Sequence, residues 1–165
     1  TKVEYPSQLM RFGGALKFRL RLTSSGIAVV PAVGVAYTSF SVSAAENGSK
    51  LQGLPQVAYT SLKVGVGAEA PLLDDKLLLF LNVSFLPTFA AGEVISPTYF
   101  PEGKIWGLMG HLGASYQIIG GLEARLVFQF ERYDLSFTTE PADTYKASGA
   151  ADLMVGGTLG VGYRF

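Results

Sequence analysis

The 165-residue chain contains no cysteine, and only 16% of its residues are charged. Without thiols it can form neither a disulfide scaffold nor a thiolate site for zinc or an iron–sulfur cluster. Lys+Arg and Asp+Glu number 13 each, and no basic cluster exceeds the alternating Lys17, Arg19 and Arg21. We therefore expect no nucleic-acid partner. A hydrophobic content of 48% also excludes intrinsic disorder.

Long apolar runs are missing as well. A membrane-spanning helix needs roughly 20 apolar residues, whereas the longest run, from Leu77 to Leu86, is broken by Asn82 and Ser84. A helical span is therefore not expected. The length suits one domain over residues 1–165. Thr1 opens a polar segment rather than a secretory leader, and the sequence does not tell whether a leader was removed.

The apolar residues that are present recur at every second position. Leu16, Phe18 and Leu20, for example, alternate with Lys17, Arg19 and Arg21. This period is typical of strands with two different faces. The pattern predicts seven strands, over residues 15–22, 27–38, 58–69, 77–89, 106–117, 122–131 and 152–165.

The predicted strands are long, and their connections alternate in length. Most strands have about 10 to 14 residues, enough for a tilted strand to cross a bilayer. Short links at 23–26, 71–76 and 118–121 alternate with long ones at 41–56, 91–105 and 134–149. This layout is typical of an up-and-down antiparallel β-barrel in a bacterial outer membrane.

Such barrels have an even number of strands, so an eighth is expected. Residues 1–11 supply a candidate strand, interrupted by Pro6 and followed by a predicted turn at Gly13-Gly14. The alternative is that the missing strand lies upstream of Thr1, in which case the sequence is a truncated barrel.

The interleaved face favours lipid over water as the surroundings. The set Ala28, Val30, Ala32, Gly34 and Ala36 is small and uncharged, which suits a narrow lumen better than a wet exterior. Aromatic residues gather towards strand ends, where we expect them at the two membrane interfaces. They are Tyr37, Phe40, Tyr59, Phe85, Phe89, Tyr99, Phe100, Trp106, Phe130, Tyr133, Tyr163 and Phe165.

The most specific local signal is the end of the sequence, Leu159-Gly-Val161-Gly-Tyr163-Arg-Phe165. It resembles the terminal strand of small opacity-type, outer-membrane-protein A-like or W-like barrels, and the strand and loop pattern extends this resemblance over the chain. The resemblance implies a porin-like protein of the Gram-negative cell envelope, located in the outer membrane among its lipid and lipopolysaccharide. It also implies that the barrel assembly machinery recognises Leu159, Val161, Tyr163 and Phe165.

Charges of both signs share the predicted inner face. Because an unpaired ion in a low-dielectric lumen costs several kcal/mol, we expect a structural ion-pair network there. Its members are Lys17, Arg19, Arg21, Lys63, Glu69, Glu123, Arg125, Glu131, Asp152 and Arg164. No cofactor is expected, and the acidic turn at Asp74-Asp75 is expected to be solvated rather than to bind a metal.

The single His111 raises the possibility of a hydrolase. Ser115 shares its face, but four residues along a strand separate the two side chains by roughly 13 Å, too far for a nucleophile and its base. Another serine could still meet His111, as in outer-membrane lipid A deacylases of this architecture. No motif supports such a site, and no catalytic residue is predicted.

The link at 91–105 is unusually apolar. Ile95, Tyr99 and Phe100, with Trp106 beside them, are candidates for covering the barrel mouth or contacting a protein partner or lipopolysaccharide. The function predicted from the sequence is a non-enzymatic membrane anchor or interaction platform with three long extracellular loops. The alternatives are a narrow channel for small or apolar solutes, an outer-membrane lipid hydrolase and a soluble ligand-binding barrel.

Overall fold

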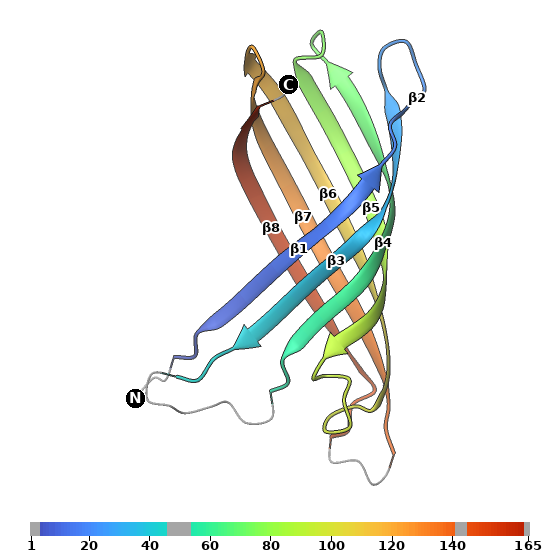
Figure 1. The fold of residues 1–165 in the computed structure, drawn as a ribbon, viewed down its shortest axis with the longest axis vertical. Coiled ribbons are helices and arrows are strands. Elements are labelled where there is room, and N and C mark those ends of the chain that lie inside the picture. The colour runs from blue at the N-terminus through green and yellow to red at the C-terminus, as the bar shows by residue number, and fades with distance from the viewer. Residues whose placement is uncertain (1–3, 46–53, 141–144, 164–165) are drawn as a thin grey trace.

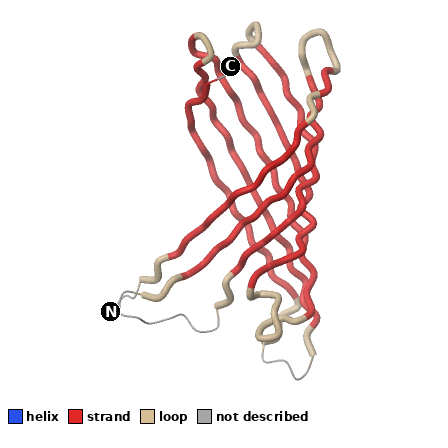
Figure 2. The backbone as a smooth tube through the Cα atoms, viewed as in Figure 1, coloured by secondary structure: helices blue, strands red, loops and turns tan. Residues whose placement is uncertain are grey.

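The computed structural model describes residues 4–45, 54–140 and 145–163, which form one antiparallel sheet curled into a half-barrel (Figure 1). The strands are β1 (Ser7–Lys17), β2 (Leu20–Arg21), β3 (Ala28–Val42), β4 (Val57–Leu72), β5 (Leu77–Gly92), β6 (Glu102–Ile119), β7 (Leu122–Thr138) and β8 (Gly149–Tyr163). Within these ranges, no helix is long and apolar enough to cross a bilayer. All of the regular structure in them is β-strand (Figure 2), which confirms the predicted all-β class.

The strands follow one another in an up-and-down order, β1-β3-β4-β5-β6-β7-β8, with β2 paired to β3. The short connections 22–27, 73–76 and 120–121 lie together at what we call the turn end. The long connections follow β3, β5 and β7, and their described residues, 43–45, 54–56, 93–101, 139–140 and 145–148, lie at the opposite, loop end (Figure 1). The predicted alternation of short and long links is therefore confirmed, although β6 begins four residues before the predicted start at Trp106.

The turns owe their shape to local chemistry. In the first, Gly26 takes a φ of 86° and its N–H donates to the carbonyl of Thr23 at 3.1 Å. Thr23 also accepts a hydrogen bond from the backbone N–H of Ile27 at 3.2 Å through its side chain. Glycine reaches this left-handed region without steric penalty, which explains its place in the turn.

The first strand differs from the prediction. No turn occurs at Gly13-Gly14: β1 runs straight through both glycines, which pair with Ala36 and Val35 of β3. After a break at Phe18 and Arg19, β2 continues β1 and pairs with the same strand, β3. The predicted count of eight strands holds, but it consists of seven long strands and the two-residue β2.

Close approach of backbones explains Gly13 and, on the neighbouring strand, Gly34, whereas a Cβ on Gly14 would meet nothing within 4 Å. A Cβ on Gly13 would lie 2.6 Å from the carbonyl oxygen of Val35 and 3.2 Å from Cα of Ala36. A Cβ on Gly34 would lie 2.6 Å from Cα of Ala15. Glycine lets the curled sheet bend tightly between β1 and β3, so these residues mark a close approach inside a strand.

Both edges of the sheet are exposed. Among the described residues, β1 pairs only with β3 and β8 only with β7. Six successive antiparallel pairings connect β1 to β8, so the two edge strands run in the same direction, from the loop end to the turn end. The described sheet is therefore an open half-barrel.

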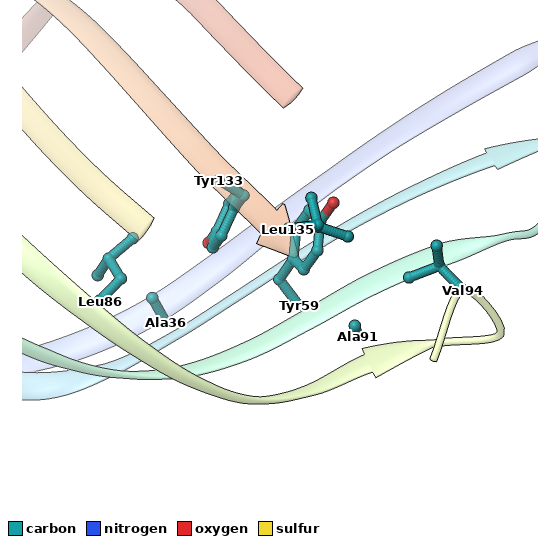
Figure 3. Close-up of a cluster of buried hydrophobic side chains, with 7 residues drawn as sticks. All are labelled: Ala36, Tyr59, Leu86, Ala91, Val94, Tyr133 and Leu135. Atoms are coloured by element: carbon teal, nitrogen blue, oxygen red, sulfur yellow. The ribbon is translucent and has the colours of Figure 1, made fainter. Parts of the chain in front are cut away.

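The best-packed part of the interior lies near the loop end. Seven side chains form this cluster (Figure 3): Ala36, Tyr59, Leu86, Ala91, Val94, Tyr133 and Leu135. They come from β3, β4, β5, β7 and the connection after β5. The packing therefore joins strands that are not neighbours in the sheet, and it does so across the inside of the curl.

Candidate functional site

The two faces of the sheet can be assigned from contacts between distant strands. Thr38 on β3 bonds to Glu131 on β7, and Tyr59 on β4 stacks on Tyr133 on β7. These strands are not neighbours, so their side chains meet only inside the curl. The residues in register with them line the concave face, and the alternate residues line the convex face.

The convex face is apolar and exposed. A band of this face extends across the sheet at the height of β6 residues Gly110 to Tyr116. By register, the described convex positions within this band carry no charged side chain. The charged pair Arg132 and Asp134 lies nearer the loop end, with the two side chains 2.7 Å apart. Exposed residues of this face include Leu16, Val33, Leu62, Val64, Leu81, Val83, Leu112, Phe128, Val155 and Leu159.

Aromatic side chains border this apolar face at both ends. Trp106 is exposed on β6 near the loop end, and its ring lies 6.0 Å from that of Phe85. Tyr116 is exposed on the same strand near the turn end, as is Tyr163 on β8. Trp106, which the sequence placed beside the apolar link and at the start of the predicted strand 106–117, lies within β6.

Two of the aromatic residues expected at a membrane interface lie elsewhere. Tyr59 and Tyr133 are fully buried on the concave face, with ring centroids 3.9 Å apart. Both tyrosines alternate in phase with the charged residues of β4 and β7, so their side chains point to the concave face. Burial there does not leave their hydroxyl groups unpaired, because both form hydrogen bonds. The expectation was therefore wrong for this pair.

The charged candidates occupy the concave face by register. Among them, Lys17, Arg21, Lys63, Glu69, Glu123, Arg125, Glu131 and Asp152 lie at concave positions. Arg19, between β1 and β2, joins them by donating from Nε to Glu69 at 2.8 Å. Arg164 and Phe165 lie outside the described residues.

Glu131 is the centre of a buried hydrogen-bond network. Its Oε1 accepts hydrogen bonds from Thr38 Oγ1 and from the Tyr133 hydroxyl, each at 2.6 Å. Its Oε2 lies 3.5 Å from Nε of Arg11. Tyr59 donates from its hydroxyl group to Asp152. Since Tyr59 stacks on Tyr133, the network extends across the inside from β1 to β8.

Arg11 was missed among the charged candidates for a specific reason. It was assigned to the end of a separate strand, whereas it shares the face of Lys17 in the continuous β1. The even spacing of six residues between Arg11 and Lys17 was the signal that could have identified it. Arg125 finds a different partner, because its guanidinium lies 4.8 Å from the ring centroid of Phe80.

The connection 93–101 packs inward at the loop end. Val94 is buried in the cluster of Figure 3, and Ile95 and Phe100 pack against that cluster. Phe100 stacks on Phe137 of β7 with centroids 3.9 Å apart. Tyr99 faces Tyr145 at 5.1 Å, which connects this segment with the one before β8. The apolar loop residues thus anchor the connection to the strands.

The structure brings no catalytic set around His111. By register, His111 lies between Asn82 and Gln129. Ser115 is buried beside Arg125 in the ladder, and within the described part of the chain its Oγ has no hydrogen-bond partner. The same described residues contain no cluster of three or more His, Asp or Glu side chains suited to a metal ion.

A cavity of about 910 Å³ opens at the loop end between the two edges of the sheet. Leu9 of β1 lines one side, and Asp152 and Met154 of β8 line another. Thr38 and Tyr59 contribute polar groups, while Phe40, Val57 and Leu135 supply apolar surface. Its position makes it continuous with the opening of the half-barrel.

Comparisons of the chain with protein-family models, with curated proteins and with solved structures find no match. The function of the chain is therefore inferred from the geometry of this sheet. That geometry combines an apolar convex face, a charged concave face, a packed loop end and two free edges.

Proposed function

We propose that this chain is an integral protein of a bacterial outer membrane, in which the half-barrel forms part of a transmembrane β-barrel. It acts without catalysis, as an anchor that presents its loop-end segments to other molecules. The observation that carries the proposal is the opposite chemistry of the two faces: apolar outside and charged within.

The height of the apolar face supports this proposal. Trp106 and Tyr116 are ten residues apart on the convex side of β6. At about 3.3 Å per residue they are roughly 33 Å apart along the strand. A tilt of about 40° reduces this to about 25 Å along the membrane normal, the height of the apolar band in outer-membrane barrels. The two rings then lie at the two interfaces.

Lipid is a more favourable environment than water for the convex face. Removing the exposed half of a Leu or Phe side chain from water contributes about 1 kcal/mol. The ten convex residues named above, which are 40–79% exposed, therefore contribute on the order of 10 kcal/mol. A barrel in water would need the reverse arrangement, with charged residues outside.

The loop end provides the interaction surface of the proposed platform. Packing of Val94, Ile95 and Phe100 fixes the connection 93–101 to the strands. Tyr99 and Tyr145 remain partly exposed on it. A surface with aromatic rings held in place suits contact with lipopolysaccharide or with a protein partner.

Trp106 allows a test in the unmodified protein, because it is the only tryptophan in the sequence. The protein is extracted from membranes and reconstituted in vesicles whose lipids carry bromine at defined depths. We expect strong quenching by bromine near the carbonyl region, weaker quenching by bromine at the chain ends, and little quenching by aqueous iodide. Two results together would contradict the proposal: release of the protein from membranes by alkaline carbonate, and quenching of Trp106 by aqueous iodide but not by the brominated lipids.

A further inference from the structure

The two free edges of the half-barrel specify what can complete it. We infer that a β-strand outside the described residues inserts between β1 and β8, antiparallel to both, and runs from the turn end to the loop end. The inference rests on the proposed membrane location in two places: the need to pair the edge groups, and the exclusion of a second copy of the chain.

Hydrogen bonding makes the two edges binding surfaces. β1 has 11 residues and β8 has 15, and about half of the residues in each point their N–H and C=O groups away from the sheet. In hydrocarbon these groups have no water to bond, so leaving them without a partner is strongly unfavourable. A strand of similar length satisfies both edges at once.

Direction decides between the possible occupants. β1 and β8 both run from the loop end to the turn end, so direct closure would pair them in parallel. Copies of this chain inserted with one orientation would also meet edge to edge in parallel. An antiparallel ladder requires an odd number of added strands, and one is the smallest number.

Charge indicates the chemistry of the added strand. Six basic residues at concave positions (Arg11, Lys17, Arg19, Arg21, Lys63 and Arg125) face four acidic ones (Glu69, Glu123, Glu131 and Asp152). Within the described residues, Lys17 and Lys63 have no carboxylate within 4.0 Å, and Lys63 is repelled by Lys17 and attracted by the more distant Glu131. Nε of Arg11 is buried and forms no hydrogen bond there, although Oε2 of Glu131 lies 3.5 Å away.

These features define the expected pattern of the strand. Its alternate residues are apolar, in continuation of the convex face, and the others include at least one carboxylate near Lys17 and Arg11. Its length matches the 11 to 15 residues of the two edges. Its end at the loop end borders the cavity between Leu9 and Asp152, which it would narrow.

Photo-cross-linking in native membranes tests the inference. A benzophenone amino acid replaces Met10 or Leu16 on β1, or Leu153 or Leu159 on β8, all exposed on the convex side. Leu81, with a described strand on either side, is the matched control. Cross-linked peptides are then identified by mass spectrometry.

The expected result is that all four edge positions link to one alternating segment outside the described residues, and that Leu81 does not. Leu16 and Leu159, at the turn end, link to its amino-terminal half, and Met10 and Leu153 to its carboxy-terminal half. Links between β1 and β8, links between isotopically distinguished copies, the reverse order, or no link to such a segment would overturn the inference. Carbonate extraction of the same membranes tests the proposed location separately.

Discussion

Arginine in place of Leu112 gives a quantitative test of the lipid-facing surface. Leu112 is 57% exposed on the convex side of β6 and pairs with Leu81 and Phe128. It lies about midway between Trp106 and Tyr116, hence near the middle of the proposed membrane. In water, a substitution at such an exposed position changes stability by about 0.5 kcal/mol or less. In lipid, an arginine at this depth costs about 2–4 kcal/mol.

The assay is reversible urea unfolding of the reconstituted protein in lipid vesicles, followed by the fluorescence of Trp106. With a slope of about 2 kcal/mol per molar urea, the unfolding midpoint of Leu112→Arg falls by about 1–2 M. Tyr116→Arg, at the proposed interface, lowers stability by about 0–1 kcal/mol.

Gln129→Arg is the matched control on the other face. Gln129 is the register partner of His111, so it lies at nearly the same depth as Leu112 but on the polar concave side. We expect a change of about 1 kcal/mol or less, because the charge remains among polar groups. Equal small effects for Leu112→Arg, Tyr116→Arg and Gln129→Arg would refute the reasoning that the convex face contacts lipid.

Two further predictions concern the interior. Glu131→Gln weakens the hydrogen bonds from Thr38 and Tyr133 and removes the charge opposite Arg11. We expect it to lower the free energy of unfolding by about 2–3 kcal/mol in the same assay. An unchanged urea midpoint would show that the network does not contribute to stability. Phe100→Ala removes the stack on Phe137, so proteases added at the loop end cut the connection 93–101 several-fold faster. Unchanged cleavage would mean that this stack does not hold the connection.

The strands could be predicted because one physical rule decides them. Successive side chains of a strand point to opposite faces, so a strand whose two faces have different surroundings alternates apolar and polar residues. The alternation around Leu16, Leu81 and Phe128 follows from this two-residue period. The same rule placed the charged residues on one face before any contact was known. It needed no information about distant parts of the chain.

The errors arose where distant contacts decide the outcome. Gly13 and Gly14 are common turn residues, but here Gly13 accommodates the backbone of Val35 and Ala36 on the neighbouring strand. Tyrosine is common at membrane interfaces, but Tyr59 and Tyr133 stack on each other inside the curl, and each donates a hydrogen bond to a carboxylate. Sequence spacing carries no direct signal for contacts between residues so far apart in the chain.

The central claim is that neighbouring residues of one strand face lipid and lumen in turn, and spin labels on β5 test it most directly. Because the sequence has no cysteine, Leu81→Cys and Asn82→Cys can each carry a single label without other changes. In lipid vesicles we predict that molecular oxygen, which dissolves in hydrocarbon, broadens the signal at position 81 more strongly than a water-soluble nickel chelate does. We predict that oxygen is markedly less effective at position 82, where the label faces the lumen. Equal access of the nickel chelate to both labels, or the opposite order, would contradict the account.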